Sequence, residues 1–93
     1  MSTVRVGDFE WDEAKARANL RKHGVSFTDA VTVFLDPRAI DAPDLEYADR
    51  FVVIGRATST RVLFVVYAER LDRVRLISAR KASPSQRRIY EEG

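Results

Sequence analysis

Cysteine is absent from this 93-residue sequence, and histidine occurs once, at His23. Without cysteine the chain can form no disulfide, thiolate zinc site or iron–sulfur cluster, and it has no cysteine nucleophile. A single histidine also excludes a metal site built from several imidazoles. We therefore expect neither a metal nor any other cofactor.

Long hydrophobic runs are also missing. The longest, Val62 to Ala68, has seven residues, whereas a membrane helix needs about 20. Residues Met1 to Asp8 lack the apolar stretch of a secretory signal, so we expect a cytoplasmic protein without a membrane partner. There is no Gly-rich phosphate loop, Gly-x-Ser-x-Gly elbow or His-Glu-x-x-His pair, which leaves nucleotide hydrolysis, ester hydrolysis and zinc proteolysis unsupported.

Charge is unevenly distributed, although the net charge is only +2. Residues 1–46 hold six basic and nine acidic side chains, whereas residues 47–93 hold ten basic and five acidic ones. Thirteen of the sixteen basic residues are arginine, whose planar guanidinium binds phosphate through two hydrogen bonds and stacks on bases. The C-terminal half therefore suggests polyanion binding, although genomic base content can also enrich arginine.

Periodicity and capping residues predict one α+β domain over residues 1–93. Predicted helices are Glu13 to Lys22 between Asp12 and Gly24, a short helix from Ser26 to before Asp36-Pro37, and one opened by Ser83-Pro84-Ser85-Gln86. Predicted strands are an N-terminal β element around Val4 to Trp11, a short strand at Ala39 to Asp41, and Phe51 to Ile54, Val62 to Ala68 and Arg73 to Ala79. Short connections predict an antiparallel sheet of three to four strands plus the N-terminal element, flanked by the helices.

One candidate site lies on the first predicted helix. Lys15, Asn19 and His23 are spaced four residues apart, so they share one helix face. They form either a solvated face or a substrate-facing ridge on which the imidazole acts as a general acid or base. Spacing alone does not choose between these interpretations.

A second candidate site follows the last predicted strand. Arg73 and Arg75 are about 6.6 Å apart on one strand face, close to a phosphate repeat, and can follow a nucleic-acid backbone. The other cations here are Arg80, Lys81, Arg87 and Arg88. The alternative is a solvated outer face, and Tyr90 supplies either a phenol or a packing anchor. Acidic residues between Asp36 and Asp49 lack the spacing of a calcium loop and are interpreted as a solvated loop.

Several motifs together resemble the BrnT family of bacterial toxins, from about Phe9 to Glu92. They are Phe9-Glu10-Trp11-Asp12, Lys15-Ala16, Asn19, Lys22-His23-Gly24-Val25-Ser26-Phe27, Asp36-Pro37, Ile54-Gly55, Arg73 to Ala82 and Tyr90-Glu91. The resemblance implies a RelE-like fold and a type II toxin, a ribonuclease that arrests translation. It also implies a BrnA-like antitoxin with a ribbon-helix-helix domain, through which alone the toxin reaches DNA. One departure is Gln86, where the family often has an acid.

The resemblance and the chemistry together suggest roles for the candidate residues. RNA is cleaved without a metal when the 2′-hydroxyl attacks the adjacent phosphate, which needs a base, an acid and cations for the pentavalent phosphate. We assign charge stabilisation to Arg80 and Lys81 and proton transfer to His23 or Tyr90. RNA binding is assigned to Lys15, Asn19, Arg73, Arg75, Arg87 and Arg88. A noncatalytic nucleic-acid-binding or co-repressor module uses the same arginines, and a pure protein-interaction module would bury them against an acidic partner.

Overall fold

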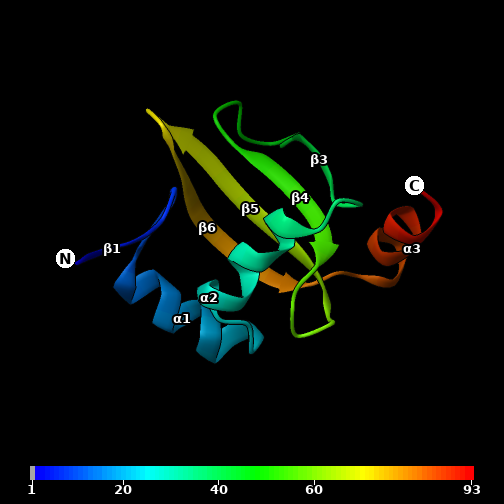
Figure 1. Cartoon of the computed structure of the whole chain (residues 1–93), viewed down its shortest axis with the longest axis horizontal. Helices are drawn as coiled ribbons and strands as arrows, with labels where there is room; N and C mark the ends of the chain where they lie inside the picture. The colour runs from blue at the N-terminus through cyan, green and yellow to red at the C-terminus, as the bar shows by residue number, and fades with distance from the viewer. Residues whose placement is uncertain (1) are drawn as a thin grey trace.

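The computed structural model describes residues 2–93, and its α+β architecture confirms the predicted class (Figure 1). Six strands form one sheet in the order β1-β2-β6-β5-β4-β3. In chain order the elements are β1 (Thr3–Val6), β2 (Phe9–Asp12), α1 (Glu13–His23), α2 (Phe27–Ala30), the 3-10 helix η1 (Val31–Leu35), β3 (Ile40–Pro43), β4 (Phe51–Arg56), β5 (Val62–Arg70), β6 (Arg73–Lys81) and α3 (Pro84–Glu92).

The sheet is mixed, which corrects the prediction of a wholly antiparallel sheet. Strands β4, β5 and β6 form the expected antiparallel meander, and β1 and β2 form an antiparallel hairpin. However, β2 pairs with β6 in parallel, with Phe9 opposite Val74 and Glu10 opposite Arg75. The hairpin thus joins a strand more than sixty residues away, and short-range turn patterns carry no information about such a pairing.

The hydrophobic core lies between the sheet and the helices α2 and η1, which run across one of its faces in Figure 1. Phe27 of α2 and Val33 of η1 are at most 2% exposed and pack in one cluster with Leu63 and Val65 of β5. The indole of Trp11 meets the Phe27 ring edge-on at 5.9 Å. This one cluster fixes the sheet, both N-terminal helices and the hairpin relative to one another.

Within residues 2–93, α3 is the helix that packs on the opposite sheet face, and it covers one end of that face. Side chains alternate along β5, and Leu63, Val65 and Tyr67 point into the core. The residues between them therefore point to this second face; they are Phe64, Val66 and Ala68. Tyr90 of α3 closes one end of it against Ile54 and Val62. We call the face of β4, β5 and β6 that lies opposite α2 and η1 the open face.

A β-bulge in β6 decides which of its arginines reach the open face. Tyr67 pairs with Leu76 and Val66 pairs with Ser78, so Ile77 is the extra residue. Arg75 and Arg80 are five positions apart, so in a regular strand their side chains would point to opposite faces of the sheet. The extra residue shifts the alternation by one position, and both side chains therefore point to the open face.

The second predicted helix is divided into the single turn α2 and the 3-10 helix η1. Ser26 Oγ caps its start by accepting from the Asp29 N–H at 3.0 Å, as the sequence predicts. The β-branched residues Val31, Thr32 and Val33 then follow one another, a run with weak α-helical preference. No helix within residues 2–93 is both long and apolar enough to span a membrane.

Candidate nucleic-acid interface

Arg80 lies half-buried on the open face and is held on several sides. Its Cζ is 4.4 Å from the ring centroid of Phe64, its cross-strand partner. Its Nη1 donates to the backbone carbonyl of Lys81 and to Oε1 of Gln86, both at 3.1 Å. All of these partners are neutral, and within residues 2–93 Arg80 forms no ion pair. The guanidinium is therefore held in a fixed place, and none of the partners that hold it carries a negative charge.

Two adjoining hollows on the open face form what we call the basic groove. Their volumes are about 370 and 640 Å³, and both are lined by Arg70 and Arg75. The charged lining residues are Arg5, Lys15, Arg50, Arg70, Arg73 and Arg75, together with Glu10, Asp49, Glu69 and Asp72. Cations exceed acids, which favours an anionic ligand. Arg50 and Arg70 were not predicted as site residues, because nothing in their local sequence distinguishes them from other surface arginines.

Arg75 and Arg73 are less free than the sequence suggests. Nη1 of Arg75 is 3.0 Å from Oε2 of Glu10, which is only 8% exposed. Nη1 of Arg73 donates to the Gly7 carbonyl at 2.7 Å. Both arginines line the basic groove, but each also ties β6 to the N-terminal hairpin. The acid that pairs with Arg75 comes from β2, and only the parallel pairing places it there.

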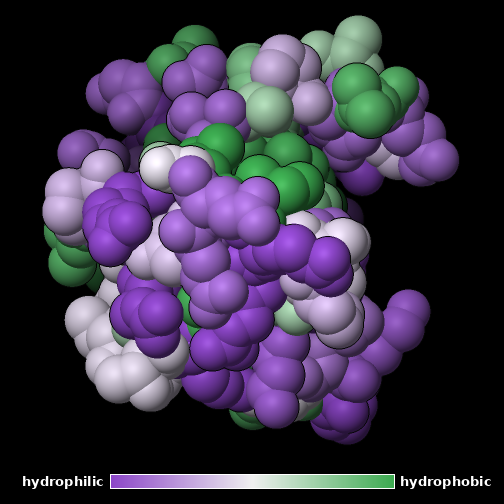
Figure 2. All heavy atoms as spheres, turned by 90° about the vertical axis from the view of Figure 1, so that its right-hand side faces the viewer, coloured by the Kyte–Doolittle hydropathy of each residue, from purple (hydrophilic) through white to green (hydrophobic). Residues whose placement is uncertain are grey.

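The structure does not bring Lys81 to the same face as Arg80. Adjacent strand residues point to opposite sides, so the exposed Lys81 leaves the sheet on the side of α2. Arg87 and Arg88 lie on the exposed side of α3, and Arg87 pairs with Glu91 at 3.2 Å. Seen from the α3 end, the molecule is mostly hydrophilic, and its outline is indented on one side (Figure 2).

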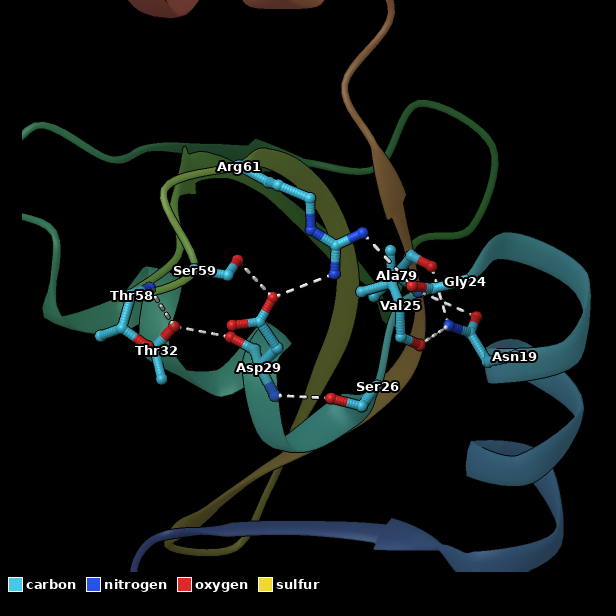
Figure 3. Close-up of polar contacts among 10 residues, drawn as sticks. All are labelled: Asn19, Gly24, Val25, Ser26, Asp29, Thr32, Thr58, Ser59, Arg61 and Ala79. Carbon is cyan, nitrogen blue, oxygen red and sulfur yellow. Dashed lines mark hydrogen bonds and ion pairs between the residues drawn. The ribbon is translucent and has the colours of Figure 1, made fainter.

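The three residues of the ridge predicted on α1 differ in how far they are buried. The middle one, Asn19, was predicted to bind RNA, but its side chain has a structural role. Asn19 is 8% exposed, and its side chain binds the backbone of Ala79 and the carbonyl of Val25 (Figure 3). Both amide hydrogens donate to backbone carbonyls and the amide oxygen accepts from a backbone N–H, so the amide of Asn19 is engaged by the protein itself. The outer two residues differ: Lys15 is exposed and lines the basic groove, and His23 is half-buried at the end of α1.

A second polar cluster, around Asp29, fixes the loop between β4 and β5 (Figure 3). Oδ2 of Asp29 accepts from Ser59 Oγ at 2.7 Å and pairs with Arg61 Nη2 at 3.2 Å. Arg61 also donates to the carbonyl of Gly24, just after α1. Sequence reasoning missed Arg61, because Asp29 and Arg61 are 32 residues apart and only the fold brings them together.

Tyr90 is a buried anchor between three segments. Its hydroxyl donates to Oδ2 of Asp36 at 2.6 Å, and its ring packs on Ile54 and Val62. That hydrogen bond, burial and the charge of Asp36 raise the pKa of Tyr90, against the opposing effect of Arg56. A tyrosine acting as a general base needs the opposite shift.

The hydrogen bond from Tyr90 also affects the pKa of Asp36. Burial acts to raise the pKa of Asp36, but the hydrogen bonds from Tyr90 and from the N–H groups of Arg56 and Arg38, with the charge of Arg56, lower it overall. Of the other acids in this loop, Asp41 accepts from the Tyr67 hydroxyl, and Asp44 caps its own turn at Glu46 N–H. No cluster of three metal-ligating side chains is found in the part of the chain that the structure describes.

Comparisons with known proteins decide the family. A family model described as "Ribonuclease toxin, BrnT, of type II toxin-antitoxin system" matches residues 11–86. The chain belongs to the BrnT family. It is therefore a ribonuclease toxin of a type II toxin–antitoxin system, which implies an RNA substrate and an antitoxin partner.

The crystal structure of the Brucella abortus ribonuclease toxin BrnT is similar to this chain. The TM-score is 0.66 at 30% sequence identity, and the match covers 78% of this chain and 92% of that one. No curated protein matches the sequence. The BrnT family match includes Lys15, His23, Arg75, Arg80 and Lys81 but ends before Arg87, Arg88 and Tyr90.

Proposed function

We propose that this BrnT protein is a metal-independent endoribonuclease that binds RNA on its open face and cleaves it beside Arg80. The observation that supports this most is the state of Arg80, a cation that has no acidic partner within residues 2–93 and is fixed on the same face as the basic groove. Groups that are already oriented stabilise a transition state without first reorganising.

The proposed reaction is attack by a ribose 2′-oxygen on the adjacent phosphorus. The O2′–P bond forms and the P–O5′ bond breaks, so the products carry a 2′,3′-cyclic phosphate and a 5′-hydroxyl. A base takes the 2′-hydroxyl proton, and an acid gives a proton to the 5′-oxygen. Arg80 stabilises the extra negative charge on the pentavalent phosphate.

His23 is the proposed proton carrier, since the raised pKa of Tyr90 opposes a role as base. Lys15 and Arg75 line one hollow, and Asn19 binds Ala79, so α1 and β6 run side by side. Four helix residues advance about 6 Å, and two strand residues advance about 6.6 Å. From Asn19 and Ala79 onward, this rise brings His23 near Lys81 at the end of β6, so we propose that RNA held by Arg80 passes this end of the sheet to reach the imidazole.

The RNA path we propose runs from the basic groove to Arg80. Arg75 and Arg80 are separated by about 13 Å of strand once the bulge is allowed for. Lys15, Arg73 and Arg75 contact phosphates along this path, while Arg87 and Arg88 extend the positive surface beyond α3. These contacts are mainly electrostatic, so RNA binding weakens as salt concentration rises.

In the cell, we propose that this activity arrests translation in the cytoplasm and that the fold is RelE-like. A BrnA-like antitoxin with a ribbon-helix-helix domain neutralises the toxin and connects it to DNA. The toxin itself contacts RNA, with no membrane partner and no cofactor. Family membership supports the antitoxin and the RNA.

The test is cleavage of a defined RNA by the purified chain, with EDTA present, together with a copy carrying 2′-deoxyribose at the cleaved position. We expect 2′,3′-cyclic phosphate ends from the RNA and no cut in the modified copy. Arg80→Ala with Lys81→Ala abolishes cleavage, whereas the exposed Arg38→Ala does not. Loss of activity in EDTA, restored by magnesium, would contradict the proposal.

A cellular experiment tests translation arrest. Controlled expression in bacteria is followed by translation rate and by transcript 5′ ends, for wild type and for the same double variant. We expect rapid arrest with new ends, both lost in the variant. Intact transcripts with RNA bound to a folded protein would favour the noncatalytic binding module instead.

A further inference from the structure

The side chain of Gln86 connects α3 to the guanidinium of Arg80. Its Oε1 accepts from the Ser83 N–H at 2.9 Å and from Nη1 of Arg80 at 3.1 Å. The Gln86 N–H in turn donates to Ser83 Oγ at 3.2 Å, which completes a capping box. One amide oxygen thus serves two donors, one in the helix cap and one in β6.

The contacts of Arg80 leave part of its guanidinium unused. Nη1 is engaged by Gln86 and by the Lys81 carbonyl, and the Phe64 ring lies at 4.4 Å. Within residues 2–93, neither Nε nor Nη2 of Arg80 donates a hydrogen bond to the protein. A guanidinium has five N–H donors in a rigid plane, so fixing one end also orients the other.

We propose that Gln86 is a positioning residue that holds Arg80 in the orientation in which its remaining donors bind phosphate. This rests on the proposed ribonuclease function. The side chain is suited to the task because its oxygen accepts from the guanidinium while the helix cap holds that oxygen in place. Capping the helix and orienting the arginine use the same oxygen, so Gln86 itself connects α3 to the proposed cleavage site.

The test separates orientation of Arg80 from stability of α3. Gln86→Ala removes the shared oxygen and lowers kcat at saturating RNA about tenfold, the effect of one lost hydrogen bond to a charged group. Gln86→Glu keeps an acceptor and the capping box, so its kcat stays within about threefold of wild type. Ser83→Ala is the matched control: it lowers Tm by about 4–8 °C through the lost cap but leaves kcat unchanged.

A double-mutant cycle shows whether Gln86 acts through Arg80. In the Arg80→Ala single variant, whose residual cleavage is measured with protein in excess over RNA, adding Gln86→Ala changes the cleavage rate by less than about twofold if the two residues act as one unit. An undiminished tenfold effect in that background overturns the proposal. A fall in kcat for Ser83→Ala that matches Gln86→Ala overturns it too, because capping alone would then explain both.

A spectroscopic measurement tests positioning without relying on catalysis. In ¹⁵N–¹H spectra of the full chain, we expect the Arg80 side-chain N–H signals to be resolved and slowly exchanging in wild type and in Gln86→Glu. Gln86→Ala broadens or shifts them. Unchanged signals in Gln86→Ala refute the positioning role. A wild type that shows these signals but cleaves no RNA refutes the proposed function while upholding the placement of Arg80.

Discussion

The side-chain amide of Asn19 forms two hydrogen bonds with the backbone of Ala79, sixty residues further along the chain. Nδ2 donates to the carbonyl at 2.8 Å and Oδ1 accepts from the N–H at 3.1 Å. A neighbouring strand would make the same two hydrogen bonds to the N–H and C=O of one residue. Here a helix side chain makes them, at a position on β6 that β2 does not reach. Asn19 thereby attaches α1 to the strand that carries Arg80.

Asn19→Ala is expected to lower the free energy of unfolding by about 3 kcal/mol, since it leaves one buried N–H and two buried carbonyls with lost partners. Denaturant unfolding measures the change. Lys22→Ala, at an exposed site on the same helix, should change it by less than about 0.5 kcal/mol. Similar values for the two variants would show that the Asn19 bonds contribute little.

Arg75→Ala is expected to destabilise the protein by about 2–4 kcal/mol, because Glu10 would stay buried with its closest cation removed. Arg5 is exposed and lies 3.8 Å from the same carboxylate. Arg5→Ala should lower the free energy of unfolding by less than about 1 kcal/mol. Thermal and denaturant unfolding distinguish these outcomes. RNA binding by Arg75→Ala should therefore be measured at a temperature where the variant is shown to be folded, so that a loss of binding is not caused by unfolding.

Gly55→Ala is expected to cost about 1–3 kcal/mol, because an added Cβ lies 3.0 Å from Cβ of Ala39 and 3.2 Å from Cβ of Val33. The strain should come from crowding, so adding Ala39→Gly should recover part of the loss despite the flexibility of glycine. Denaturant unfolding of the single and double variants provides the comparison. No recovery in the double variant would show that Ala39 is not the obstacle.

The stability of the protein is expected to fall at alkaline pH through Tyr67. Burial, then the charge of Asp41 and its hydrogen bond from the hydroxyl, then Glu69, raise the pKa of Tyr67 from 10.0 to about 12. A raised pKa means that the unfolded state loses its proton first, so the contribution is complete below pH 10 and is lost as the pH rises to about 12.

Unfolding followed between pH 9 and pH 12 tests this. Tyr67→Phe should flatten the decline, whereas Tyr47→Phe, at a tyrosine that is 47% exposed, should not. A slope that is the same in all three proteins would contradict the assignment to Tyr67.

Much of the fold was predictable because its signals are local. Ser83, Pro84 and Gln86 specify the start of α3 within four residues, and the meander follows from short connections between apolar runs. The β2–β6 pairing was not predictable, because it depends on a contact between distant segments with no turn between them. The bulge at Ile77 was missed for a similar reason: its effect on Arg80 appears only in the register with β5.

The candidate site divides in the same way. Sequence patterns found Arg80, Lys15 and Arg75, which the structure places on or beside the open face. They also selected Asn19, because helical spacing shows that residues share a face but not whether that face meets solvent or protein. Lys81 was grouped with Arg80 by adjacency, although neighbouring strand residues point to opposite sides.

The parallel pairing of β2 with β6 also sets when the proposed cleavage site can form. Strand β6 is synthesised after the other five strands of the sheet, and until it emerges β2 lacks its inner neighbour and Asn19 lacks the Ala79 backbone to which it binds. Closing so long a chain segment is slow compared with forming local helices and hairpins. A growing polypeptide therefore cannot assemble the proposed RNA-binding face before β6 has been synthesised.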